Sequence, residues 1–174
     1  MSLPAHGRRG FLGITAAGLL GALAATPARA LDAPTGPVIL SVSGRIAHRN
    51  AIDAAEFDLA MLRKLPQHSF STRTPWYPQP RKFSGVPLQE LMKAVGAQGS
   101  TARAVALNDY RVDIPTDDFA RHGALLAHLL DDQPMAVRDK GPLVIIYPFD
   151  DRPELRTALY YGRAIWQLRS LELR

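Results

Sequence analysis

The sequence contains no cysteine, and this absence removes several chemistries at once. Without a thiol the chain forms no disulfide and offers no thiolate to a metal ion or a substrate. It also lacks a glycine-rich phosphate loop, and its serines lack the glycine-flanked context of a hydrolase nucleophile. These absences disfavour a disulfide scaffold, a nucleotide hydrolase and a serine hydrolase.

Histidines are few, and basic residues form no stripe. The four histidines after residue 30 show neither the i, i+4 nor the H-x-H spacing of a metal site; they are His48, His68, His122 and His128. No basic stripe with interleaved aromatic residues occurs, so a nucleic-acid partner is not expected. The paired acids 117–118 and 131–132 are predicted to be a cap and a turn rather than an acid/base dyad.

The first 30 residues have the pattern of a bacterial export signal. Arg8 and Arg9 precede an apolar run over 11–25, and Ala28-Arg29-Ala30 forms a small-residue cleavage site. The paired arginines followed by Phe11 and Leu12 favour the twin-arginine route. We expect cleavage after Ala30 and a periplasmic protein, with an uncut membrane anchor as the alternative. Removing residues 1–30 lowers the formal net charge from +5 to +2 because they carry three arginines and no acid.

The remaining residues, 31–174, predict one α+β domain with a mainly β core. Asp58 is a good N-cap for a short helix that Pro66 closes, and Pro87 and Gly96 bracket a helix with an apolar stripe. The segment 124–130 is strand or helix, and a bulge is expected between Leu168 and Leu171. The other expected elements are strands at 38–46 and 143–147, a strand running into a loop over 68–80, a hairpin turning at 108–109, and short helices at 116–119 and 153–163.

Three polar clusters stand where predicted strands end, which is where loops converge on ligands. Each cluster alone is equally well read as a turn with ordinary caps. Together they supply aromatic faces, hydroxyls, an amide, carboxylates and cations, which predicts a shared pocket. Tyr147 and Trp166 lie within strand patterns and are assigned to the core. The three clusters are Thr72-Arg73-Thr74-Pro75-Trp76-Tyr77, Asn108-Asp109-Tyr110 and Arg138-Asp139-Lys140.

The order of several motifs resembles a known family. They are FDLAMLRKLPQHSFSTRTPW, FSGVPLQELMKAVGA, ALNDYRVDIP, PMAVRDKGPLVIIYPFD and IWQLRSLELR. In this order they resemble the small exported members of the oxidoreductase molybdopterin-binding family, over about residues 38–174. The resemblance implies the sulfite-oxidase fold.

The resemblance also shows where this chain departs from the enzymes of the family, which hold molybdenum through a cysteine thiolate. Counting back from Trp76, the matching position is Thr72. A hydroxyl is a poor replacement for a soft thiolate, so redox catalysis is put in doubt while the pterin pocket is not. Short members without the cysteine resemble periplasmic pterin-binding proteins, some of which report pterin to a membrane protein that controls cyclic-di-GMP.

The chemistry of the clusters agrees with a pterin, a flat ring with a 2-amino-4-oxo edge. A carboxylate accepts its two adjacent donors in parallel bonds, and Asp109 and Asp139 are the candidates. Donors for the 4-oxo group are Arg138, Lys140 and Asn108. Stacking faces are Trp76, Tyr77 and Tyr110, and hydroxyls come from Thr72 and Thr74. In a full molybdopterin, Arg138 and Lys140 would meet the phosphate.

Three functions follow as hypotheses. The first is a periplasmic protein that binds a small pterin without metal or turnover and signals to a membrane partner. The second is a molybdopterin-dependent oxidoreductase with a non-cysteine metal site. The third is a scaffold with a decayed pocket that binds only another protein. The first is preferred because the residues of the clusters suit a pterin and the metal-binding thiolate is missing.

Overall fold

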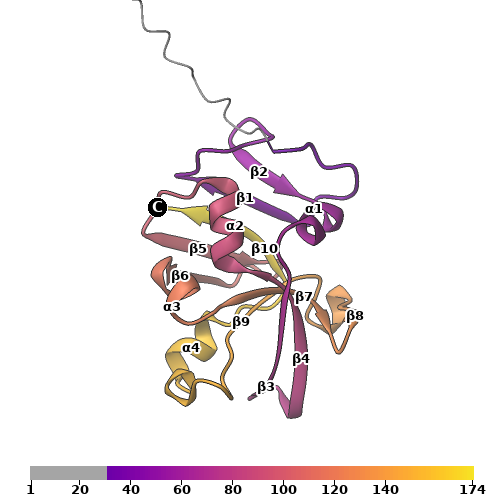
Figure 1. Ribbon diagram of the computed structural model, residues 1–174, viewed down its shortest axis with the longest axis vertical. Coiled ribbons are helices and arrows are strands. Elements are labelled where there is room, and N and C mark those ends of the chain that lie inside the picture. The colour runs from indigo at the N-terminus through magenta and orange to yellow at the C-terminus, as the bar shows by residue number, and fades with distance from the viewer. Residues whose placement is uncertain (1–30) are drawn as a thin grey trace, which may run out of the picture.

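Two five-stranded sheets build the part of the chain that the computed structural model describes, residues 31–174 (Figure 1). The expected export signal lies outside the described residues. In the first sheet the strand order is β2-β1-β10-β5-β6, and β1 pairs in parallel with β10 while the other pairs are antiparallel. Its strands are β1 (Leu40–Gly44), β2 (Ala54–Phe57), β5 (Thr101–Ala106), β6 (Arg111–Pro115) and β10 (Leu168–Leu173).

The second sheet has the order β3-β4-β7-β8, and β9 also pairs with β7. Its hairpin β3–β4 reaches the bottom of the view in Figure 1. Four short helices and two 3-10 turns join the sheets. These elements are β3 (His68–Thr74), β4 (Tyr77–Pro87), β7 (Leu125–Leu130), β8 (Gln133–Pro134), β9 (Val144–Ile146), α1 (Leu59–Lys64), α2 (Leu88–Val95), α3 (Asp117–Arg121), α4 (Ala158–Arg163) and the turns Val137–Asp139 and Pro153–Leu155.

The helix ends form as the sequence predicts. The Asp58 carboxylate accepts a 2.8 Å bond from the Met61 N–H and so caps α1. Helix α2 follows Pro87 and ends at Gly96, whose φ of 59° is the left-handed conformation that glycine tolerates best. Both predicted boundaries are therefore confirmed to within one residue.

Strand patterns were predicted less completely. The hairpin at residues 108–109 is confirmed, residues 124–130 form strand β7, and the register of β10 shifts between Leu168 and Ser170. The exposed loop expected after residue 74 is wrong, because the chain turns at 75–76 and returns as β4, eleven residues long. The short strand β2 was not predicted.

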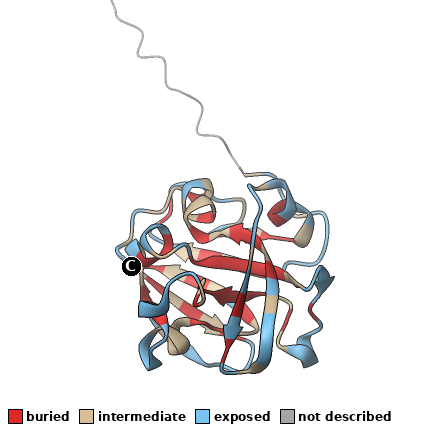
Figure 2. Cartoon of the chain, turned by 60° about the horizontal axis from the view of Figure 1, so that its bottom comes forward, coloured by how far each residue is buried: buried red, intermediate tan, exposed pale blue. Residues whose placement is uncertain are grey.

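Buried residues lie along the strands in the interior of the domain (Figure 2). Within the second sheet, a Cβ on Gly85 would lie 2.0 Å from the carbonyl oxygen of Leu126, so β4 approaches β7 more closely there than a side chain allows. Tyr147 is fully buried, which confirms its assignment to the core. No helix among residues 31–174 is long and apolar enough to cross a membrane.

Candidate functional site

Trp166 is the centre of an aromatic cluster that brings together parts of two predicted loops. Its ring meets Trp76 edge-on at 5.1 Å and Tyr77 edge-on at 5.9 Å between centroids. The Nζ of Lys140 lies 5.7 Å from the centroid of the same indole. A cation at this distance from an indole is favourably placed. The 72–77 and 138–140 clusters therefore meet at one residue, Trp166.

One face of this cluster opens into a cavity of about 230 Å³, which we call the aromatic cavity. Asn108 and Tyr110 of the hairpin turn lie at its edge, so all three predicted clusters reach Trp166 or its immediate surroundings. The Tyr110 hydroxyl donates a 2.9 Å bond to the carbonyl of Gly162 and ties the turn to α4. The cavity is lined by Trp76, Ala106, Asn108, Tyr110, Tyr161, Gly162, Ala164, Ile165, Trp166 and Gln167.

A second, more polar cavity of about 680 Å³ lies on the other side of Lys140, and we call it the charged cavity. Its lining combines cations with one free-standing acidic side chain, Asp139, which makes only a 3.4 Å contact with the neighbouring Arg138. Arg81 lies over the Tyr77 ring at 4.7 Å. The lining residues are Tyr77, Arg81, Leu130, Gln133, Pro134, Met135, Ala136, Arg138, Asp139 and Lys140.

Gln167, which lines the aromatic cavity, is hydrogen-bonded to the segment that lines the charged cavity. Its backbone N–H donates to the Lys140 carbonyl at 3.0 Å, and its side-chain amide donates to the Val137 carbonyl at 2.7 Å. Lys140 and Gln167 have positive φ angles of 75° and 54°, respectively. Residues other than glycine rarely adopt this backbone conformation unless surrounding contacts stabilise it. These bonds fix the 137–139 turn against Trp166.

Burial is the largest influence on the pKa of Tyr77, which contacts Trp166 and lines the charged cavity. Loss of solvent raises the pKa of the Tyr77 hydroxyl; the nearby Arg81 opposes this rise, and the carboxylates of Asp139 and Asp131 add to it. Tyr77 is therefore a neutral donor and acceptor at neutral pH. Asp139 and Tyr77 line the same cavity, the charged cavity.

Helix α4, which carries Tyr161 and Gly162, is anchored from behind by a buried ion pair. Arg163 donates a 2.6 Å bond to Asp118, and both side chains are largely buried. The expectation that the 117–118 pair serves as a cap is wrong, since Thr116 is the N-cap of α3, Asp117 is the first helical residue and Asp118 faces inward. The 131–132 pair does form the predicted turn, between β7 and β8.

Three of the predicted residues lie away from both cavities. Thr72 is fully buried and lines neither. Thr74 lies in a smaller cavity beside Asp150, where its hydroxyl accepts a bond from the Trp76 N–H at 3.3 Å. Asp109 points toward Arg169 and pairs with it at 2.9 Å. The structure thus does not bring Thr72, Asp109 and Asp139 to one cavity.

Sequence reasoning missed the residue on which the site is centred. Trp166 was assigned to the core, but it is only partly buried and lines the aromatic cavity. Tyr161, Gln167 and Arg81 were also missed. The expected bulge near Leu168 was the available signal, because an irregular strand start turns neighbouring side chains out of the core.

The chain was compared with known proteins. No family model and no curated protein matches it. Among solved structures it is similar to the crystal structure of the sulfane dehydrogenase SoxCD from Paracoccus pantotrophus, with a TM-score of 0.58 and 14% identity. The match covers 77% of this chain and 37% of that chain, so this chain spans well under half its length. At this identity the likeness shows a shared fold, a mixed α/β arrangement of two sheets with few short helices, and carries no statement about activity.

Proposed function

We propose that this protein binds a small pterin in the cleft around Trp166 and performs no redox catalysis. The observation that carries the proposal is the aromatic cluster itself: Trp76 and Trp166 are only partly buried and line the aromatic cavity, and Tyr77 contacts Trp166 and lines the charged cavity. A flat heterocycle is the ligand that such faces bind best. The likeness to SoxCD supports the sulfite-oxidase fold that the sequence motifs imply.

The polar groups around the cluster suit the two edges of a pterin. The Asn108 carbonyl oxygen is occupied by the Tyr110 N–H at 3.1 Å, which leaves the side-chain NH₂ to donate to a ring nitrogen. Asp139 lines the charged cavity together with Tyr77, and its ion-pair contact among the described residues is the one with Arg138 at 3.4 Å. In the proposed complex its carboxylate would accept the paired donors of the 2-amino edge.

A metal-bound cofactor fits these residues less well. Thr72, the position that the resemblance matches to the metal-binding cysteine, is fully buried and its hydroxyl is already hydrogen-bonded within the protein. It is therefore not directed at a cavity where a metal would lie. The molybdenum-dependent alternative has no other ligand assigned, and we derive no step through it. The periplasmic location and the membrane signalling partner stay predictions from the sequence.

The test is binding of pterin to the full protein, followed by tryptophan fluorescence. Both tryptophans of the chain lie at the proposed site, so quenching of their emission reports on this cleft alone. Saturable quenching by pterin, and none by adenine, which lacks the 2-amino-4-oxo edge, is expected. Absence of saturable binding would overturn the proposal, and near-stoichiometric molybdenum in protein from its native host would favour the oxidoreductase.

A matched pair of variants in the hairpin turn sharpens the test. Asn108→Asp keeps the oxygen that accepts from Tyr110, replaces the proposed NH₂ donor by a charged acceptor, and should therefore lower pterin affinity about tenfold or more. Asp109→Asn, one residue away, alters a side chain that faces Arg169 and should leave the affinity unchanged. Equal effects of the two substitutions would place the ligand elsewhere.

A further inference from the structure

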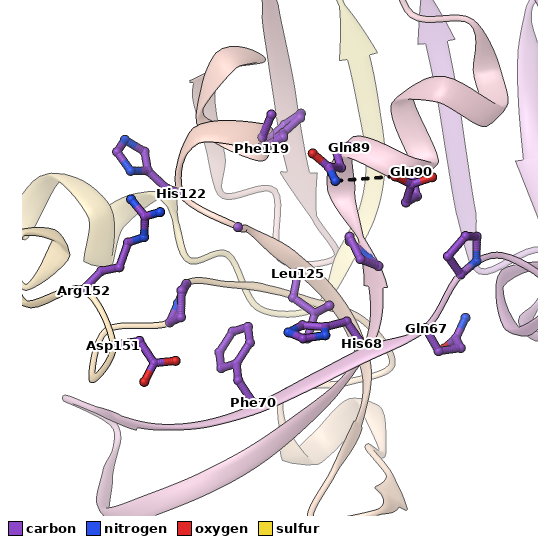
Figure 3. A pocket seen from close by; sticks show the side chains of 15 residues that line it. Gln67, His68, Phe70, Gln89, Glu90, Phe119, His122, Leu125, Asp151 and Arg152 are labelled. Carbon is purple, nitrogen blue, oxygen red and sulfur yellow. Dashed lines mark hydrogen bonds between the residues drawn. The ribbon is translucent and has the colours of Figure 1, made fainter.

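A further cavity lies away from Trp166, along one side of β3. It has a volume of about 510 Å³, and we call it the edge groove. Figure 3 shows His68 and Phe70 on β3, with Asp151 and Arg152 across the groove from the side chains of α2. The lining residues are Pro66, Gln67, His68, Phe70, Pro87, Gln89, Glu90, Phe119, Ala120, His122, Gly123, Leu125, Pro148, Asp151 and Arg152.

Strand β3 is the edge of its sheet, since it pairs only with β4. Ser71 lies opposite Lys82, whose backbone carbonyl and N–H both bond to Asp131 on the far side of β4, at 2.8 and 2.9 Å. Lys82 therefore makes no ladder bonds to Ser71. Because the N–H and C=O of a strand residue point the same way and alternate along the strand, the backbone groups of Ser69 and Ser71 face the open edge.

The far end of this edge is capped by the protein itself. The Arg73 N–H, which points the same way as that of Ser71, donates to the Asp150 carboxylate at 3.0 Å. No such cap is described for Ser69 or Ser71, and both residues are exposed. Proteins usually protect an open edge with lysine, proline or a bulge, and residues 68–72 contain none of the three.

The groove beside this open edge has an apolar floor and a charged rim. Phe119 and Leu125 are buried at its base, and Phe70 is half-buried in its wall. At the rim, Glu90 is paired with Lys93 at 2.7 Å, whereas Asp151 has no ion-pair partner among the described residues. The groove and the adjacent edge of β3 therefore present open backbone donors and acceptors, an apolar floor and one carboxylate without an ion-pair partner among the described residues.

We propose that the edge groove binds an extended segment of another protein, which pairs with β3 as a sixth strand of this sheet and carries an apolar anchor side chain next to a basic one. The open backbone groups of Ser69 and Ser71 select an extended main chain, since only a strand presents matching donors and acceptors. The floor formed by Phe119 and Leu125 receives the anchor. The rim carboxylate of Asp151 selects lysine or arginine. This proposal does not depend on pterin binding.

The probe is a blocked peptide, acetyl-Lys-Val-Thr-Leu-Thr-Val-Lys-amide, whose palindromic sequence makes the test independent of strand direction. Saturable binding to the full protein by isothermal titration calorimetry is expected. Ser71→Pro removes the outward N–H without touching the bonds to β4 and should weaken binding about tenfold or more. Ser71→Ala keeps that N–H and should bind as the unaltered protein does.

Controls separate the proposal from its alternatives. The same peptide with every internal amide N-methylated leaves the protein unchanged and should lose binding, so the proposal stays testable even if Ser71→Pro fails to fold. Equal binding of the methylated peptide would overturn strand addition. A concentration-dependent dimer of the protein alone, abolished by Ser71→Pro, would show that the edge binds a second copy of this chain instead.

Discussion

The backbone N–H of Asp150 donates a 3.0 Å hydrogen bond to the hydroxyl of Thr72, 78 residues earlier in the chain. The same hydroxyl contacts the Arg73 carbonyl at 3.3 Å, and the Asp150 carboxylate binds the Arg73 N–H and, at 2.7 Å, Arg156. Thr72 thus joins β3 to the segment after β9. At the position where the resemblance places a metal-binding cysteine, this chain has a buried structural hydroxyl.

Thr72→Val should therefore destabilise the fold more than it affects ligand binding. Valine fills nearly the same volume but leaves the Asp150 N–H without an acceptor, which costs about 1–3 kcal/mol of the free energy of unfolding. Urea unfolding measures this loss. Thr72→Ser retains the acceptor, so it should preserve the hydrogen-exchange protection of the Asp150 amide, while the valine variant should lose it. A large loss of pterin affinity with unchanged stability would instead make Thr72 a ligand contact.

Asp139→Asn should show the opposite pattern. The side chain is 68% exposed and contacts only Arg138, so the free energy of unfolding should change by less than about 0.5 kcal/mol. If its carboxylate accepts two pterin donors, losing one charge-assisted bond should weaken pterin binding by about tenfold to a hundredfold. Calorimetric titration and urea unfolding of the same preparation separate the two effects. Equal losses would mark Asp139 as a structural residue.

The adjacent residues Asp117 and Asp118 in α3 should differ in how much they contribute to stability. Asp118 is paired with Arg163 in the interior, and removing one partner of a buried ion pair costs about 3–5 kcal/mol because the other charge stays buried. Asp117 is 78% exposed and pairs loosely with Arg121, at 3.4 Å. Asp118→Ala should therefore lower the thermal midpoint strongly, and Asp117→Ala should change it little. Similar midpoints would contradict an interior role for Asp118.

Local signals predicted local structure well. The Asp58 cap, the Gly96 helix end and the 108–109 turn depend on residues within one or two turns of each other, so the sequence shows them directly. The strand β4 was missed because Pro78 and Pro80 argue against a strand, and tertiary pairing with β3 overrides that preference. Its Pro-containing start lies where the register between the two strands is irregular.

The site was predicted in its residue types and only partly in its geometry. Trp76, Tyr77, Lys140 and Tyr110 do converge on one region, but the centre of that region, Trp166, comes from a strand end that resembled core sequence. Side-chain direction after an irregular strand start depends on the backbone angles of single residues, such as the positive φ of Gln167. A sequence pattern with a period of two carries no information about such a residue.

Acid should weaken the fold through Asp58. The N–H groups of Met61, Gly36 and Thr35 bind its carboxylate and lower its pKa from 3.8 to about 2. Because the folded-state pKa lies below the unfolded one, this stabilisation is complete above about pH 4 and is lost as the pH falls toward 2. Asp58→Asn should lower stability at neutral pH, and its difference from the unaltered protein should shrink between pH 4 and pH 2. Urea unfolding across that range measures the difference, and a constant gap would show that the pKa of Asp58 is not lowered in the folded state.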